Sequence, residues 1–373
     1  MASKTYKCPN CGAALEFDAS DGTVDCAYCL SEFTVPEVEE YNKRITEQLA
    51  QNDTATEAEH RDYSAKGIPQ TETRSTESTA SNEKLHSYNC DSCGAEVICN
   101  ENTSATYCYY CHQPVVLTDR VSGKFKPDKL LPFKITRDEA VSRFLKWCEG
   151  KRYLPSDFTS DSHLEKMTGV YLPVWLAEVE NSADFRGQAV QRTRMDSRRE
   201  SIDTYEIGRT GKLTLKNMME IAFSSSDKIS PEAFETIANF GWEDLQDFSA
   251  VYLSGFFSEL WSIGPEDAAA QAEDKAQNYV SRAISNELNM AYQNVSLSKA
   301  EVQPKLTNLN YVLAPAWVLT YKFHKKIYLY VMNGQHGQIY GELPMDNSRV
   351  FRTAAIIFLV LLISLLLGGK FLW

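Results

Sequence analysis

The sequence lacks the motifs of the common enzyme classes. Its 373 residues include only six histidines, which are scattered along the chain. They form no His-Glu-x-x-His metalloprotease motif, and neither a Gly-x-Ser-x-Gly nucleophile elbow nor a Walker phosphate loop occurs. We therefore expect a protein that is not an enzyme, with no catalytic residues, no organic cofactor and no small-molecule substrate. A catalytic pocket within residues 121–345 is the alternative.

Basic charge is scarce where nucleic-acid binding would need it. The formal net charge is -12 at pH 7. Residues 1–35 hold two lysines against five carboxylates, and residues 86–118 hold three carboxylates and neither lysine nor arginine. Lysine and arginine contacts to phosphates supply most of the non-specific affinity of nucleic-acid-binding proteins. The charge pattern therefore argues against nucleic acid as a partner of these two stretches.

A secretory signal is missing as well, because residues 1–7 contain no apolar run. We therefore expect the cysteines to face the reducing cytosol, where thiols bind metals more often than they form disulfides. Ten cysteines are present. Their spacing is more informative than their number.

Eight of the cysteines fall into two arrays with the same spacing. In each array, a second Cys-x-x-Cys pair begins fifteen positions after the first pair ends. Four thiolates bind Zn²⁺ tetrahedrally and leave no position for water, so such an ion is structural rather than catalytic. We predict two zinc ribbons, residues 1–35 and 86–118, with one structural Zn²⁺ each. The predicted ligands are Cys8, Cys11, Cys26, Cys29, Cys90, Cys93, Cys108 and Cys111.

The two arrays also form an internal repeat. The pattern Tyr-x-Cys-x-x-Cys-Gly-Ala starts at Tyr6 and again at Tyr88, and short strands are expected at residues 15–17 and 96–98. His112, beside the last cysteine, is an alternative ligand, which we expect to be an exposed neighbour instead. A ribbon that has lost its metal is a further alternative, but the complete set of thiols argues against it.

Residues 36–85 separate the two ribbons and are rich in Glu, Thr, Ser, Gln and Asn. A segment of this composition buries too little apolar surface to offset the entropy lost on ordering. We predict a flexible acidic linker, in which the apolar residues between Glu37 and Leu49 have helical spacing.

Residues 121–345 have the composition of a folded domain. Helix-start signals occur at Thr136, Ser230 and Gly264, and the first of these forms a capping box with Glu139. The first helix would place Cys148 in the core. Strand patterns lie at residues 129–135, 170–176, 311–323 and 327–331. We predict a mixed α+β cytosolic domain with an antiparallel sheet.

Two clusters in this domain have both a structural and a functional interpretation. Eight basic residues between Arg186 and Lys216 could contact anionic lipids or an acidic partner, but the carboxylates among them favour a solvated face. Aromatic residues between Trp317 and Tyr330 could stack on single-stranded nucleic acid, but packing within a sheet is their more frequent role. We take the structural interpretation in both cases.

One long apolar run is present, the seventeen uncharged residues from Thr353 to Gly369. At 1.5 Å per residue this run spans roughly 26 Å, close to the thickness of a hydrocarbon core. A buried helix of a soluble protein would show a polar stripe, which the run lacks. We therefore predict a C-terminal transmembrane anchor within residues 350–373.

The orientation of this anchor follows from charge and from redox chemistry. Arg349 and Arg352 precede the apolar run, whereas Lys370 alone follows it. Basic residues favour the cytoplasmic side, and metal-binding thiolates need a reducing compartment. We expect a single-pass protein of the cell membrane with its N-terminal bulk in the cytoplasm.

Several motifs together resemble a protein family. The opening stretch is similar to that of bacterial membrane-associated proteins with transcription-factor-IIB-type zinc ribbons, through Tyr6-Lys7-Cys8-Pro9-Asn10-Cys11-Gly12. The later motifs that resemble this subgroup are Leu131-Pro132-Phe133, Tyr171-Leu172-Pro173-Val174-Trp175, Pro315-Ala316-Trp317 and Asn333-Gly334-Gln335. The resemblance implies protein partners of the flotillin-like SPFH or phage-shock type in membrane maintenance.

These expectations combine into one hypothesis. The chain is a non-enzymatic, membrane-tethered zinc-ribbon adaptor or scaffold, and the resemblance implies a role in membrane-stress or membrane-organisation complexes. The alternative is a membrane-anchored zinc-ribbon regulator that binds nucleic acid. Salt-sensitive retention of residues 1–118 on nucleic acid would favour the alternative.

Overall fold

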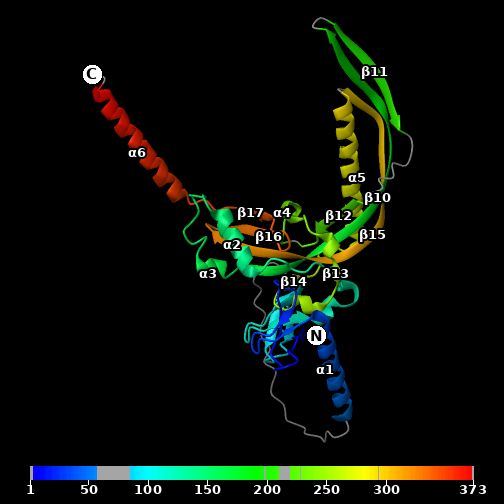
Figure 1. The fold of residues 1–373 in the computed structure, drawn as a ribbon, viewed down its shortest axis with the longest axis vertical. Helices are drawn as coiled ribbons and strands as arrows, with labels where there is room; N and C mark the ends of the chain where they lie inside the picture. The colour runs from blue at the N-terminus through cyan, green and yellow to red at the C-terminus, as the bar shows by residue number, and fades with distance from the viewer. Residues whose placement is uncertain are drawn as a thin grey trace, which may run out of the picture. The chain divides into compact units, whose positions relative to one another are not determined.

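A computed structural model describes residues 3–56, 85–196, 199–209, 219–226, 228–292 and 294–371. Within these residues the chain is a mixed α+β protein, as the sequence predicted (Figure 1). It folds into two compact units, Met1–Lys126 with Phe248–Leu260 and Pro127–Asp247 with Trp261–Trp373. These units differ from the predicted domains, because both ribbons lie in one unit and a piece of the predicted 121–345 domain folds with them.

The first ribbon contains a small antiparallel sheet. Its strands are, in order, β2 (Glu16–Phe17), β3 (Val24–Asp25) and β4 (Glu32–Phe33). Gly22 lies between β2 and β3 with φ of +78°, a conformation that glycine adopts without steric cost. Leu15 and Val24 are fully buried, so the ribbon has a small apolar core in addition to its cysteines.

The second ribbon is built from two hairpins. One pairs β5 (Leu85–Asn89) with β6 (Glu96–Asn100), and the other pairs β7 (Thr103–Tyr107) with β8 (Pro114–Leu117). The core of this ribbon consists of Tyr88, Cys90, Val97, Cys108, Val115 and Leu117. Two 3-10 turns, η1 (Thr118–Val121) and η2 (Gly123–Phe125), follow β8.

The two ribbons are joined directly. Strand β1 (Ser3–Lys4), which begins the first ribbon, pairs antiparallel with β8 of the second, so that Lys4 lies opposite Val116. The buried hydroxyl of Thr5 donates a hydrogen bond to the carbonyl of Pro114 (3.1 Å). The ribbons therefore form one two-site module rather than two modules kept apart by a linker.

Helix α1 (Val35–Thr56) occupies the part of the chain where the flexible linker was expected to begin. Its side chain at Val38 is fully buried. Asn42 accepts a hydrogen bond from the N–H of Lys7 (3.1 Å) and donates one to the carbonyl of the same residue (3.3 Å). These contacts fix the helix to the first ribbon. The rest of the predicted linker, residues 57–84, lies outside the described residues.

A segment from far along the chain completes the first unit. It contains η4 (Ala250–Leu253) and β14 (Phe257–Glu259), and β14 pairs antiparallel with β7 of the second ribbon. On the first ribbon, the N–H of Phe17 donates to the carbonyl of Ser254 (3.0 Å), and the hydroxyl of Ser254 donates to the carbonyl of Leu15. Residues 248–260 therefore contact both ribbons.

The second unit is built on two long antiparallel strands, β10 (Thr168–Asp196) and β15 (Asn294–Phe323). They pair from Thr168 opposite Val318 to Val190 opposite Asn294. The remaining strands are β9 (Lys129–Leu130), β11 (Arg199–Arg209), β12 (Met219–Ser224), β13 (Gln246–Asp247), β16 (Lys326–Asn333) and β17 (Ile339–Gly341). β11 and β12 pair with β10, whereas β16 pairs with β15 and β17 with β16.

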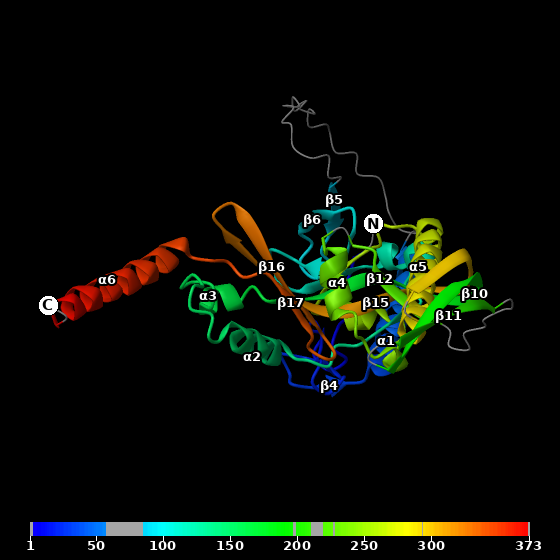
Figure 2. The same ribbon diagram turned by 90° about the horizontal axis from the view of Figure 1, so that it is seen from above.

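The predicted helix starts of this unit are confirmed. Helix α2 (Arg137–Cys148) carries the capping box, in which Thr136 and Glu139 each bond the other's N–H (both 3.3 Å), and Cys148 is buried. The other helices are α3 (Asp161–Leu164), α4 (Pro231–Ile237), capped by Ser230, and α5 (Pro265–Ala291), after Gly264. A short 3-10 turn, η3 (Trp242–Asp244), follows α4. Figures 1 and 2 both show α5 running beside the long strands.

The side-chain clusters of this unit have mixed outcomes. Trp317, Tyr321 and Tyr330 are buried, which supports the packing role predicted for the aromatic hairpin. The basic cluster is only partly described. Arg194 lies opposite Glu200 in the pairing of β10 with β11, whereas three members lie outside the described residues, namely Arg198, Lys212 and Lys216.

The last helix, α6 (Asn347–Phe371), contains the predicted apolar run. Its stretch Asn347–Leu365 is long and apolar enough to cross a membrane, and none of the window is buried. A helix of a soluble core would be covered by protein, so this exposure is consistent with a lipid-facing segment.

Candidate metal centres

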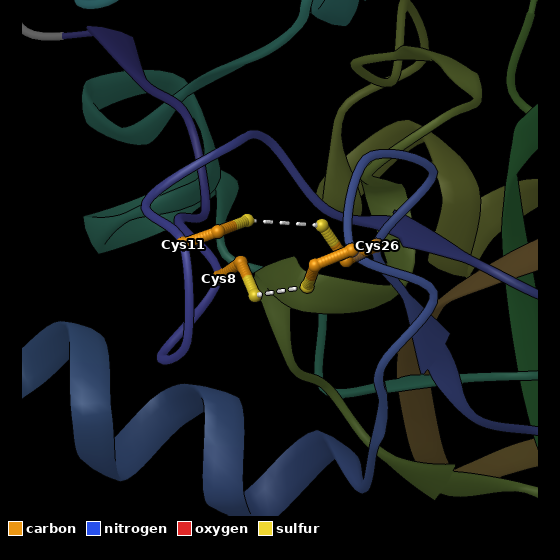
Figure 3. Close-up of side chains that lie close together, drawn as sticks. Cys8, Cys11 and Cys26 are labelled. Carbon is orange, nitrogen blue, oxygen red and sulfur yellow. Dashed lines mark hydrogen bonds between the residues drawn. The ribbon is translucent and has the colours of Figure 1, made fainter.

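Four cysteines of the first ribbon meet in one cluster, Cys8, Cys11, Cys26 and Cys29. The Sγ atom of Cys8 lies 3.6 Å from that of Cys29, and the Sγ atom of Cys11 lies 3.5 Å from that of Cys26. Figure 3 shows these two facing pairs, in which Cys8 and Cys11 from one loop point toward the loop that carries Cys26. All four sulfur atoms lie within 4.8 Å of one another.

The second ribbon repeats this arrangement with Cys90, Cys93, Cys108 and Cys111. The Sγ–Sγ distances are 3.7 Å between Cys90 and Cys111 and 3.7 Å between Cys93 and Cys108. The structure thus brings all eight cysteines of the arrays together, in the two sets that their spacing predicted. The remaining two, Cys99 and Cys148, lie outside both clusters.

Backbone hydrogen bonds explain why each Cys-x-x-Cys loop points its sulfurs inward. We call each loop, with the residues that close it, a knuckle. In every knuckle the N–H of the first cysteine bonds the carbonyl five residues on, as from Cys8 to Ala13 (2.7 Å). The N–H four residues on bonds back to the first cysteine, as from Gly12 to Cys8 (2.9 Å). The same pairs recur at Cys26, Cys90 and Cys108.

The residue after the second cysteine of each knuckle adopts a left-handed conformation. Two of these residues are glycines, Gly12 (φ +76°) and Gly94 (φ +73°), which tolerate it freely. The other two are Leu30 (φ +57°) and His112 (φ +56°). His112 is exposed and lies outside the sulfur cluster, so its place is explained by the knuckle turn and not by ligation.

The sulfur geometry fits a tetrahedral metal ion. Four sulfurs at about 2.3 Å from a central Zn²⁺ define a tetrahedron with edges of about 3.8 Å. The facing pairs, at 3.5–3.7 Å, are close to that edge length. Each cluster can therefore hold a metal ion after only a small adjustment. Four sulfurs close the coordination shell and leave no position for a substrate.

Thiol acidity within the first cluster is uneven. The hydrogen bond between the Sγ atom of Cys29 and the hydroxyl of Ser31 (3.3 Å) lowers the pKa of Cys29 to about 6. The backbone amide of Ala13 lowers the pKa of Cys11, but desolvation and the three neighbouring sulfurs outweigh it and raise this pKa to about 12. A divalent cation would offset half of the charge of four thiolates and displace their protons, because metal binding requires deprotonated sulfur ligands.

Large side chains project from the second knuckle of each ribbon. Tyr28 and Leu30 in the first ribbon are 82% and 84% exposed, and Tyr109 and Tyr110 in the second are 72% and 73% exposed. Sequence reasoning missed them. Their signal is the position between or just after the cysteines of a knuckle, because the cysteines point toward the sulfur cluster and leave the neighbouring side chains to point outward.

The chain has a relative of similar length. It is 27% identical over 378 residues to the uncharacterized protein YdjG of Bacillus subtilis (strain 168), and the alignment covers 98% of this chain and 99% of that protein. No protein-family model matches the chain, and no solved structure matches it significantly.

Proposed function

We propose that the chain is a membrane-anchored zinc-ribbon adaptor that binds partner proteins at the cytoplasmic face of the cell membrane. Each four-cysteine cluster would hold one structural Zn²⁺, and α6 would cross the bilayer once. The observation that carries the proposal is the exposed surface of the two second knuckles, formed by Tyr28, Leu30, Tyr109 and Tyr110. We call these four residues the knuckle surface.

The high exposure of the four large side chains of the knuckle surface requires a physical explanation. Tyrosine is enriched among the residues that dominate binding energy at protein interfaces, because it buries a large area with few rotatable bonds. A metal ion would hold the knuckles in one conformation. The knuckle surface would then be ordered before a partner arrives, which lowers the entropy cost of association.

Charge supports a protein partner over a nucleic acid. Both ribbons are acidic, and a Zn²⁺ ion with four thiolates carries a formal charge of about -2. Metal binding would therefore make the module more negative than its sequence alone. Phosphate backbones would be repelled, whereas a partner with basic residues around an apolar contact would be attracted.

Membrane anchoring would give the adaptor its mechanism. A span confines the two-site module to a thin layer, which raises its effective concentration toward any partner in the same membrane. The motif resemblance to membrane-associated zinc-ribbon proteins supports this role, and it makes flotillin-like SPFH and phage-shock-type proteins the first partners to test.

The test is affinity capture by the full chain from detergent-solubilised membranes. We expect the wild-type chain to recover a stoichiometric protein partner, and the triple variant Tyr28→Ser, Tyr109→Ser, Tyr110→Ser to recover at least about tenfold less, since one interface tyrosine often contributes more than a factor of ten. Zinc content should be unchanged, because the cysteines remain.

A matched control separates partner loss from general loss of surface tyrosine. Tyr279→Ser removes a tyrosine that is 62% exposed on α5, in the other unit, and should leave capture unchanged. Recovery of the chain alone, or equal recovery by the triple variant, would contradict the proposal. Salt-sensitive retention of the wild-type chain on nucleic acid would favour the regulator instead.

A further inference from the structure

The hairpin that joins β15 to β16 ends in a basic tip, residues 322–327. Lys322, Lys325 and Lys326 are exposed there beside His324, and the side chain of Ile327 is 64% exposed. No carboxylate occurs within the tip. In a chain with a net charge of -12, this is a local concentration of positive charge next to an exposed apolar group.

The turn at the tip is one that its residues do not favour. Phe323 pairs with Lys326, which leaves His324 and Lys325 as a two-residue loop. Their φ angles are +47° and +70°, as in a type I′ turn, for which Asn-Gly is the preferred sequence. Residues held in such costly backbone conformations cluster at functional sites.

The tip is connected to the base of α6. The Nζ atom of Lys326 lies 2.7 Å from the carboxylate of Glu342. Helix α6 begins five residues later, at Asn347, and five residues reach at most about 18 Å. The tip therefore lies within a short distance of the point where the apolar helix starts. Figures 1 and 2 both show the β15–β16 hairpin on the side of the second unit from which α6 leaves.

The charges of the tip and of the helix base do not cancel. Glu342 pairs with Lys326, Asp346 pairs with Arg349 (3.4 Å), and Asp157 accepts a hydrogen bond from Tyr321. Among the residues that the structure describes, Lys322, Lys325 and Arg352 form no ion pair. The tip and the first turns of α6 therefore carry positive charge that no ion pair of the described residues neutralises.

We infer that the basic tip docks onto anionic phospholipid headgroups of the membrane that α6 crosses, an inference that rests on the proposed span. Lys322 and Lys325 would contact the headgroups, while Phe323 and Ile327 would enter the interfacial layer. A docked tip adds a second point of attachment beside the helix. It would fix the second unit in one orientation on the membrane surface.

The test uses the full chain in nanodiscs of phosphatidylcholine alone and of phosphatidylcholine with one-third phosphatidylglycerol. Amide hydrogen exchange of residues 322–327 is compared between the two. We expect exchange at least about fivefold slower in the anionic discs, since each of the two lysines near an anionic surface contributes a factor of about five. The variant Lys322→Gln, Lys325→Gln should lose this difference.

Two further variants keep the inference falsifiable. His324→Asn with Lys325→Gly suits the turn, so the hairpin stays folded while the lipid-dependent difference falls. Lys305→Gln removes an exposed lysine from the same strand, up to about 55 Å away, and should leave the difference unchanged. Equal exchange of the wild-type tip in both discs, or an undiminished difference in the Lys322→Gln, Lys325→Gln variant, would overturn the inference.

The same measurement distinguishes failure of the span. If residues 353–365 exchange rapidly in both discs, α6 does not cross the bilayer, and the inference falls with the anchor. If they are protected while the tip shows no dependence on lipid charge, only the docking of the tip is wrong.

Discussion

At the residue scale, each knuckle depends on two kinds of residue, its two cysteines and the residue that directly follows the second cysteine. The cysteines supply the sulfurs, but the turn that aims them requires a left-handed residue at the next position. Gly12 and Gly94 meet this need without strain, whereas Leu30 and His112 meet it at a steric cost. Substitutions at these positions should therefore act on metal affinity without touching a ligand.

Gly94→Ala is expected to destabilise the second ribbon by about 1 kcal/mol and to lower its zinc affinity about fivefold. The cost is purely conformational, because no atom lies within 4 Å of the added Cβ. Leu30→Gly should have the opposite sign in the first ribbon, since it relieves the strain at φ +57°. Competition with a chromogenic chelator measures both, and effects of the same sign would contradict this account.

Zinc content gives the most direct prediction for the cysteines. Cys8→Ser and Cys90→Ser should each lower the zinc content by one ion per chain, because three thiolates hold a structural ion far more weakly than four. Elemental analysis of the purified full chain measures the ratio. Cys99→Ser is the matched control, since Cys99 lies outside both clusters. Unchanged zinc in both ligand variants would exclude the assignment.

At the element scale, local signals predicted where helices begin better than they predicted which elements pack against one another. Thr136, Ser230 and Gly264 each begin a helix as expected, because a cap acts through the backbone of its own first turn. The helical character of α1 was visible only as weak spacing between residues 37 and 49. Its order depends on the buried Asn42 and on a ribbon residue thirty-five positions earlier, a contact that no local pattern shows.

Asn42→Leu is expected to release α1 from the first ribbon. The substitution leaves the N–H and carbonyl of Lys7 without their partner, at a cost of about 2 kcal/mol. Amide exchange in residues 35–56 should accelerate while zinc content stays constant. Thr46→Ala, one turn further along and exposed, should change little. Unaltered exchange in the Asn42→Leu chain would show that other contacts hold the helix.

The pairing of the two long strands, β10 and β15, also depends on contacts that no local pattern shows. The sequence contains the motifs Tyr171-Leu172-Pro173-Val174-Trp175 and Pro315-Ala316-Trp317, but their pairing, with Tyr171 opposite Pro315, comes from tertiary structure. Strand β14 was not predicted at all. Its three residues have no distinctive pattern, and they become a strand because β7 offers an open edge. Pairing between segments that are far apart in the sequence cannot be predicted from hydrophobic periodicity alone.

At the scale of the whole molecule, the sequence predicted the fold class, the two cysteine clusters and the exposed apolar helix. It did not predict how the chain divides. The ribbons were expected to be separate modules, and residues 248–260 were assigned to the α+β domain, whereas both ribbons and this segment form a single unit. The cysteine spacing was sufficient for the clusters, because each forms within about twenty residues of one ribbon.

The anchor prediction also belongs to this scale. The full chain should remain in the pellet after carbonate extraction of membranes, because removing the apolar helix from lipid is costly. A chain that ends at Arg349 lacks the apolar run and should appear in the supernatant. Release of the full chain by carbonate would exclude a span, and retention of the shortened chain would show that another surface binds the membrane.

The contribution of residues 248–260 to the first unit has a consequence for synthesis on the ribosome. The last cysteine of the second ribbon, Cys111, is translated about 150 residues before Leu260. At 5–20 residues per second, the delay is roughly 7–30 s. During this interval the nascent ribbons have all their cysteines, but β7 has no β14 beside it. Every newly made chain therefore passes through a period in which an unpaired strand edge is exposed beside completed metal ligands.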